Sequence, residues 1–268
     1  KAREELIDAL TRDAHAILLA LNGLALSADV TKATTLLATV VGQDIEAGAD
    51  GVFRIVRGVA ADRVISTIDP ESRHGHKTAA RGFDGYKGHI AVDAESEIIT
   101  ATEVTAGNVG DASAAEALLK DLLVGTQNAA PSDAKHDEAK CEVYGDASYG
   151  TAELVEKLES ADVVPNVKVQ PPTAREGMFC QDDFEIDSEA GTVRCPAGIR
   201  VCLRVQKDGS SIGDFVSNCA ECPLRPQCTN SQSGRTIKLH PKHKILDRHR
   251  KHQRDPEWKK LYRKVRPR

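Results

Sequence analysis

Several features that would indicate a membrane or secreted protein are missing from this sequence. No run of apolar residues approaches the roughly 18 that a membrane-spanning helix needs, and the start has no apolar segment of the secretory type. The 7 cysteines are an odd number and lie late in the chain, which argues against a disulfide framework. The only methionine is Met178, so the sequence does not begin with one. These absences predict a cytosolic chain with reduced thiols and no membrane partner.

The composition that remains is that of a soluble globular protein, with 40% hydrophobic and 28% charged residues among 268. This length suits one large domain or two ordinary ones. The formal net charge of −4 conceals an asymmetry: residues 235–268 contain 14 Lys and Arg against 3 Asp and Glu, and residues 1–234 contain 22 against 37. A basic end on an acidic body predicts contact with a polyanion, although a solvated helix surface would carry the same charges.

The most informative short segment is 143–150, in which Asp146 ends a short apolar run. Residues 142–144 are typical of the end of a buried strand, and apolar residues at helical spacing follow from position 152. An acid at the carboxyl end of a strand in an α/β sheet is well placed to hold a metal ion. The structural alternative is a turn or capping aspartate, because strand-to-helix turns favour Asp.

Strands and helices are predicted on both sides of this aspartate. Residues 85–93 and 98–108 are β-rich runs separated by a polar turn, so they predict a hairpin. Residues 111–124 have the apolar spacing of a helix, and residues 163–169 predict a last strand. A polar stretch at 128–140 predicts a variable loop before the Asp146 strand.

This order of elements, together with several motifs, resembles the DDE transposases of bacterial insertion sequences. The motifs are GYKGHIAVD at 85–93, VTAGNVGDA at 104–112, VYGDASYG at 143–150, CPAG at 195–198, C-x2-CPLRPQC at 219–228 and W-x3-YR-x2-RP at 258–267. The resemblance implies an α/β fold with a partial RNase H-like mixed sheet core, N-terminal helices and a small β-rich cysteine insert. The expected domains are 1–52 (helical segment), 53–170 (RNase H-like core), 171–234 (cysteine insert) and 235–268 (basic helical segment).

The resemblance implies metal-dependent DNA strand cleavage and strand transfer during DNA transposition. In that family three acids hold two divalent ions, Mg²⁺ or Mn²⁺, and Asp146 matches the second acid. The partners would be double-stranded DNA of the transposon ends and target, with a homo-oligomer as the acting form and the nucleoid in the cytoplasm as its location. A related nuclease, or a truncated or decayed remnant that binds DNA and zinc without catalysis, is the alternative.

The first and third acids have no equally clear match. The resemblance places the third beyond Arg268 and the first either upstream of Lys1 or at Asp69, so we expect an internal fragment that is incomplete and inactive alone. Residues 64–68 are strand-like and end at Asp69, but an acid before proline is equally typical of a turn. The following stretch, 69–84, predicts an exposed loop without a metal, in which His74 and His76 would lie on opposite faces if extended.

The late cysteines predict a structural zinc site. Four thiolates would share one tetrahedral Zn²⁺, with short strands around them. The proposed ligands are Cys195, Cys219, Cys222 and Cys228. Cys202 is an alternative fourth ligand, ordinary reduced cysteines or disulfides are alternative states, and Cys141 and Cys180 are expected to be packing residues.

The basic end predicts one or two helices over 243–268, interrupted near Asp255, which can cap a helix that starts at Pro256. An apolar face of this last helix would pack on the core: Trp258, Leu261, Tyr262 and Val265. Its cationic face would contact the DNA backbone, which gives affinity without sequence preference. The expected DNA-binding residues are Lys259, Lys260, Arg263, Lys264 and Arg266. The N-terminal residues 1–26 and 31–41 predict two more helices. The apolar face of the first would consist of Leu6, Ala9, Leu10, Ile17, Leu18 and Leu21.

Overall fold

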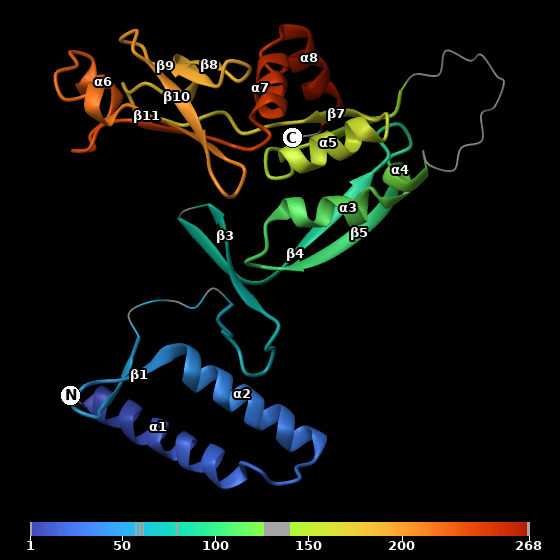
Figure 1. The fold of residues 1–268 in the computed structure, drawn as a ribbon. Helices are drawn as coiled ribbons and strands as arrows, with labels where there is room; N and C mark the ends of the chain where they lie inside the picture. The colour runs from blue at the N-terminus through green and yellow to red at the C-terminus, as the bar shows by residue number, and fades with distance from the viewer. Residues whose placement is uncertain are drawn as a thin grey trace. The chain divides into compact units, whose positions relative to one another are not determined.

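The computed structural model describes residues 2–56, 58, 60, 62–78, 80–125 and 140–266. The chain forms two compact units, Lys1–Asp93 with Ile98–Ala114, and Ala94–Glu97 with Ala115–Arg268. In Figure 1 the first unit runs from blue to green and the second from green to red. The loop expected at 128–140 lies outside the described residues except for Lys140.

Two helices and a small hairpin begin the first unit, α1 (Ala2–Leu21), α2 (Ala28–Asp44), β1 (Ile45–Ala47) and β2 (Phe53–Ile55). Both predicted helices are confirmed, and the Ser27 side chain caps α2 by accepting a hydrogen bond from the Val30 N–H. The apolar face expected for α1 is wrong for Leu6, Leu10 and Ile17, which are more than half exposed, whereas Leu18 and Leu21 are partly buried. The residues that the helix buries are Thr11 and Ala14. Contact with β2 selects this face, because the Phe53 N–H donates to Asp8 at 2.9 Å.

A three-stranded antiparallel sheet completes the first unit, with β3 (Arg73–Thr78), β4 (Arg81–Val92), β5 (Ile99–Ala106) and the short helix η1 (Asp111–Ala114) after it. The β4–β5 hairpin is confirmed, but the expected loop over 69–84 is wrong because most of it forms the β3–β4 hairpin. The rings of His74 and His76 lie 4.8 Å apart, on the same face rather than on opposite faces. Side chains two residues apart on a strand share a face.

The glycine of the VTAGN motif lies where backbone segments of this sheet approach closely. A Cβ on Gly107 would lie 2.6 Å from the Arg73 carbonyl oxygen and 2.8 Å from that of Gly85. A neighbouring ion pair ties the end of the sheet to η1, since Lys87 Nζ lies 2.8 Å from the Asp111 carboxylate. The motif is therefore explained by backbone packing inside the first unit.

A parallel strand pair with its crossover helix forms the first part of the second unit, made of α3 (Ala115–Leu118), α4 (Lys120–Gly125), β6 (Glu142–Gly145), α5 (Ala152–Ser160) and β7 (Val164–Val167). Thr151 caps α5 by accepting from the Leu154 N–H at 3.2 Å. Val155 and Leu158 on α5 are fully buried in the core of this part. The predicted strand–helix–strand around Asp146 is confirmed, whereas the helix predicted over 111–124 is divided into η1, α3 and α4.

The cysteine-rich part of the second unit is a five-stranded antiparallel sheet in the order β12–β11–β10–β9–β8. The strands are β8 (Glu185–Asp187), β9 (Thr192–Arg194), β10 (Arg200–Val205), β11 (Ser211–Asp214) and β12 (Thr236–Leu239), and α6 (Arg225–Cys228) lies between the last two. Val193 and Phe215 are buried in its core. Because β12 pairs with β11, this sheet extends across the boundary expected at residue 234.

Two helices end the described chain, α7 (His243–His252) and α8 (Pro256–Val265). The predicted break is confirmed: Asp255 caps α8 by accepting from the Glu257 N–H at 3.0 Å, with Pro256 in the first turn. Within the described ranges, no helix is long and apolar enough to cross a membrane.

The predicted mixed α/β class is confirmed, because helices and several sheets are both present. The described strands pair into four separate sheets, so the single mixed sheet of an RNase H-like core stays a prediction. Of the expected domains, 1–52 lies in the first unit, 53–170 is divided between the units, and 171–234 and 235–268 lie in the second.

Candidate active site

Asp146 directly follows β6, where the chain turns toward α5. Its Oδ1 accepts the Ser148 N–H at 2.8 Å, and its carbonyl oxygen accepts the Tyr149 N–H at 3.1 Å. The interpretation of Asp146 as a turn residue is therefore correct. The turn orients the carboxylate through Oδ1 and makes no hydrogen bond to Oδ2. The side chain remains 35% exposed.

The glycine that ends the GDASYG motif allows the turn to pass against β7. A Cβ on Gly150 would lie 1.7 Å from the Lys168 carbonyl oxygen, closer than any real contact. Two neighbouring backbone hydrogen bonds hold the same region, from Lys168 N–H to the Gly145 oxygen at 3.1 Å and from Thr151 N–H to the Tyr149 oxygen at 2.8 Å. The motif thus combines an acid with the only residue type that fits its turn.

Helix α8 packs beside Asp146 through two aromatic side chains. The Trp258 and Tyr262 rings are stacked with centroids 4.8 Å apart, and both residues are buried as predicted. The Tyr262 hydroxyl donates to the Gly145 carbonyl oxygen at 2.8 Å, next to the acid. Burial raises the pKa of Tyr262, and the charge of Arg266 acts against that rise. The prediction for Leu261 is wrong, since it is 43% exposed.

Arg266 joins the end of α8 to the candidate acid. Its Nη2 lies 3.1 Å from Asp146 Oδ2, and its Nη1 donates to the Tyr262 hydroxyl at 3.2 Å. The sequence placed Arg266 among the outward cations and missed this contact, which spans 120 positions. The only sequence signal is the spacing of Tyr262 and Arg266, one helical turn apart.

The other four expected DNA-binding side chains lie on the exposed side of α8. With Pro256 they line an open surface groove: Lys259, Lys260, Arg263 and Lys264. None of the four forms an ion pair or side-chain hydrogen bond with another residue in the described part of the chain. Their charge is therefore available to an external anion.

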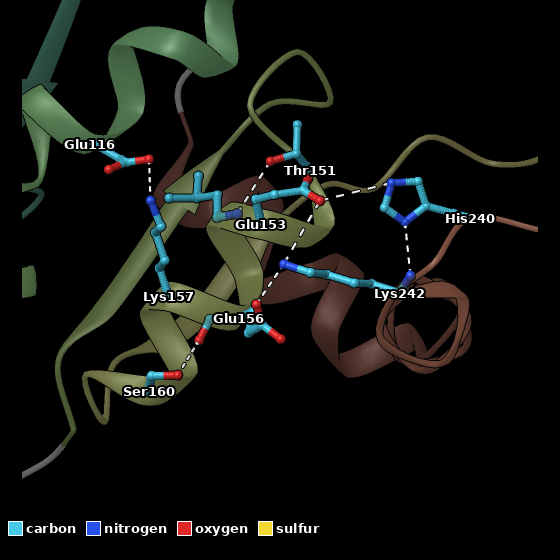
Figure 2. A network of polar contacts seen from close by, with 9 residues as sticks. Glu116, Thr151, Glu153, Glu156, Lys157, Ser160, His240 and Lys242 are labelled. Carbon is cyan, nitrogen blue, oxygen red and sulfur yellow. Dashed lines mark hydrogen bonds and ion pairs between the residues drawn. The ribbon is translucent and has the colours of Figure 1, made fainter. Parts of the chain in front are cut away.

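Several cations that precede α8 are instead paired with acids of α5, two of them in the view of Figure 2. Lys242 Nζ lies 2.6 Å from Glu156, and His240 Nε2 lies 3.8 Å from Glu153. Further along the chain, Arg248 of α7 pairs with Glu159 of α5 at 2.6 Å. The same view shows Lys157 of α5 paired with Glu116 of α3. Some cations of the basic end thus contact α5, whereas the four on the exposed side of α8 have no partner among the described residues.

Asp69 lies in the first unit, within a turn rather than at a strand end. Its carbonyl oxygen accepts the Ser72 N–H at 3.2 Å, and its carboxylate accepts the Tyr86 hydroxyl at 2.8 Å. Among the described residues, no group of three or more His, Cys, Asp or Glu side chains is positioned to hold a metal ion. Asp146 and Asp69 are thus each described without an assembled group of metal-binding side chains around them.

The seven cysteines are all described, and all are free thiols. The four predicted zinc ligands line one small cavity with Arg235: Cys195, Cys219, Cys222 and Cys228. Burial raises the pKa of the Cys228 thiol, the other three thiols act in the same direction, and Arg235 opposes them. Cys202 and Cys141 are exposed, so Cys141 does not pack as expected. The thiols converge without forming a preformed metal site, and zinc stays a prediction.

Comparison with protein families gives one match. The family model of the transposase DDE domain matches residues 54–254, which is more than half of the chain. Neither the curated proteins nor the solved structures contain a match. The matched span includes the β4–β5 hairpin, Asp146 and the cysteine-rich sheet. The chain therefore belongs to the transposase DDE domain family.

Proposed function

We propose that this transposase chain, from an insertion sequence, takes part in metal-dependent cleavage and strand transfer of DNA, with Asp146 as a metal ligand. The observation that carries the proposal is the geometry of Asp146. Its Oδ1 is fixed by the Ser148 N–H at 2.8 Å, and its Oδ2 faces a cation rather than the core. A carboxylate that the turn holds through one oxygen, with only an exposed arginine on the other, can serve as a ligand without rearrangement of the backbone.

The carboxylate of Asp146 is a ligand type that suits Mg²⁺ or Mn²⁺. Mg²⁺ prefers oxygen ligands, keeps several waters and needs few carboxylates from the protein. When bound, such an ion activates water or a DNA 3′-hydroxyl and stabilises the leaving oxygen. The chain's own residues position the ligand: Ser148 orients the carboxylate, and Tyr262 fixes the end of β6 through the Gly145 carbonyl oxygen.

The exposed cations of α8 support double-stranded DNA as the partner. Lys259, Lys260, Arg263 and Lys264 are unpaired among the described residues, whereas Lys242 and Arg248, before α8, are paired with acids of α5. Side chains of this kind bind phosphates of any sequence and set the position of the duplex. A chain that binds DNA without cutting it is the alternative, and it predicts the same binding but no role for Asp146.

The test is Mg²⁺-dependent cleavage of a duplex that carries the ends of the element, by a transposase that includes this chain. Asp146→Asn should lower the rate by about 100-fold or more, because a lost ligand removes charge stabilisation in the transition state. The matched control is Asp162→Asn, an exposed acid paired with Lys140 in the same unit, which should leave the rate unchanged. Cleavage by Asp146→Asn at the wild-type rate would refute the assignment.

The same assay applied to the 268-residue chain tests whether its acids suffice. No nicking is expected, because the described residues hold no assembled group of metal-binding side chains. Strong nicking that disappears in Asp146→Asn would show a complete set of acids within the chain. Asp69→Asn would then be the next variant to examine.

We also propose that Cys195, Cys219, Cys222 and Cys228 bind one structural Zn²⁺. Four thiols around one cavity match the ligand chemistry of a closed zinc site. The Arg235 N–H donates to the Cys219 sulfur at 3.4 Å, a contact that would stabilise a thiolate. Binding would require the four side chains to turn toward a common point.

A further inference from the structure

The contact between Arg266 and Asp146 has a consequence for metal binding. The guanidinium lies 3.1 Å from Oδ2, the carboxylate oxygen that the turn leaves unused. A divalent ion on this oxygen would be placed next to a positive charge, which is unfavourable at such a short range. Arg266 and the metal ion therefore compete for one carboxylate.

We propose that Arg266 is an exchangeable counter-ion: it neutralises Asp146 before the metal ion binds, and it transfers to a DNA phosphate when the ion takes its place. This inference rests on the proposed role of Asp146 as a metal ligand. It assigns to Arg266 a function different from that of the four unpaired cations of α8. Those bind DNA directly, whereas Arg266 couples DNA binding to metal binding.

The geometry of the ion pair suits exchange. Only one guanidinium nitrogen contacts Asp146, and the side chains are 41% and 35% exposed. Such exposed, single-contact pairs contribute only about 0–1 kcal/mol, so a divalent ion can displace the arginine. The other arm remains tethered, because Nη1 donates to the hydroxyl of the buried Tyr262 at 3.2 Å. A displaced guanidinium therefore stays within reach of the site.

The surroundings favour a phosphate as the second partner. Lys259 and Arg263 lie one turn apart on the exposed side of α8, and Arg266 is the residue that directly follows the helix. A DNA backbone bound along that side as far as the C-terminal end of α8 would reach Arg266 beside Asp146. The planar guanidinium with its several donors matches phosphate oxygens as well as it matches a carboxylate.

Exchange makes the two ligands cooperative. DNA that draws Arg266 away frees Asp146 for the metal ion, and a bound ion frees Arg266 for DNA. Such coupling is reciprocal, so each ligand should raise the affinity of the chain for the other by the same factor. A purely structural contact between Arg266 and Asp146 would give no coupling.

The experiment measures Mn²⁺ binding to a transposase that includes this chain by electron paramagnetic resonance of the free ion, with and without a short duplex. Arg266→Gln should bind Mn²⁺ about threefold to fivefold more tightly without DNA, since an exposed ion pair is lost. In this variant the duplex should no longer increase Mn²⁺ affinity. Arg204→Gln is the matched control, because Arg204 makes the same kind of single contact with Asp214 at 3.3 Å, and it should leave both values unchanged.

Two further variants separate the explanations. Arg266→Lys keeps the charge, so its Mn²⁺ affinity should stay near the wild-type value if competition is the cause. Equal or weaker Mn²⁺ binding by a folded Arg266→Gln, with Asp146→Asn impaired, would overturn the exchange while leaving Asp146 as a ligand. Wild-type Mn²⁺ binding by Asp146→Asn would instead overturn the metal assignment itself.

Discussion

The indole N–H of Trp258 donates a 2.9 Å hydrogen bond to the Asn166 side-chain oxygen, and the contact joins α8 to β7 in the interior of the second unit. The Asn166 amide in turn donates to Glu142 on β6 at 3.0 Å. A chain of polar contacts, buried at Trp258 and Asn166, therefore connects the last helix to both strands of the parallel pair. Since Asp146 follows β6 and Arg266 follows α8, this connection helps to position Arg266 next to the Asp146 carboxylate.

Trp258→Phe should destabilise the second unit. The variant keeps an aromatic ring but leaves the Asn166 oxygen without its donor, which costs about 1–3 kcal/mol for a buried group. Urea unfolding followed by circular dichroism gives the free energy of unfolding. The comparison is Leu261→Ala on the exposed side of the same helix, which should change that free energy by about 0.5 kcal/mol or less. Equal losses in the two variants would contradict this role of Trp258.

Gly150→Ala should prevent the turn after Asp146 from packing. A Cβ there would lie 1.7 Å from the Lys168 carbonyl oxygen, so the backbone of β7 or of the turn must move. We expect a loss of stability well above the typical 1 kcal/mol of a point substitution, measured as a lower thermal midpoint. The control is Gly42→Ala, where a Cβ meets nothing within 4 Å and helix α2 should gain up to about 1 kcal/mol. A wild-type midpoint for Gly150→Ala would show that the close approach is not required.

Local signals in the sequence predicted local structure well. Asp255 before Pro256 identified the start of α8, and the apolar spacing after Gly150 identified α5, because capping and periodicity act over a few residues. The position of Asp146 at the end of β6 followed from the same kind of pattern.

Contacts between distant segments were not predictable in this way. Arg266 has the composition of a surface cation, and only packing over 120 positions brings it to Asp146. The polar composition of 69–84 indicated a loop, yet pairing with β4 makes β3 a strand, since partners can override propensity. Leu261 has the hydrophobicity of a core residue. The buried side of α8 is nevertheless formed by the stacked rings of Trp258 and Tyr262, and Leu261 lies on the exposed side.

His243 should make the second unit less stable in mild acid. Burial, followed by the charge of Arg250, lowers the pKa of His243 from its ordinary value of 6.5, while Asp247 and Asp182 act against the shift. The unfolded chain therefore takes up a proton near 6.5 that the folded chain resists, so stability falls as the pH drops through this value. Urea unfolding at several pH values between 7 and 5 measures the slope.

His243→Asn should reduce this slope, because the titrating ring is gone. His252→Asn changes an exposed histidine at the other end of α7 and should retain the slope. A slope that is the same in all three proteins would assign the pH dependence to other groups.

The thiol cluster should retain one zinc ion through purification. Elemental analysis should find about one Zn²⁺ per chain, and Cys228→Ser should lose it together with thermal stability, because structural zinc stabilises the fold directly. Cys202→Ser is the control, since Cys202 is exposed and does not line the cavity. Zinc-free wild-type protein, or equal loss in the two variants, would leave four reduced cysteines around an ordinary small cavity.

The exposed side of α8 should provide most of the affinity for duplex DNA. Neutral replacement of Lys259, Lys260, Arg263 and Lys264 together should weaken binding. Each phosphate contact that is lost would no longer release condensed counterions from the DNA. The slope of log affinity against log salt should decrease by about 0.9 for every phosphate contact that is lost. Fluorescence anisotropy of a labelled duplex at several salt concentrations gives both the affinity and the slope.

A matched control removes the same number of charges from paired cations of the second unit. Each of these has an acidic partner: Lys140, Lys157, Arg204 and Lys238. If net charge alone attracts DNA, the control should weaken binding as much as the α8 variant. If α8 is the contact surface, the control should retain the wild-type salt slope, because cations paired with carboxylates release few counterions from DNA. An unchanged affinity and slope in the α8 variant would show that the cationic side of this helix is only a solvated surface. The helix would then serve the structure through the packing of Trp258 and Tyr262.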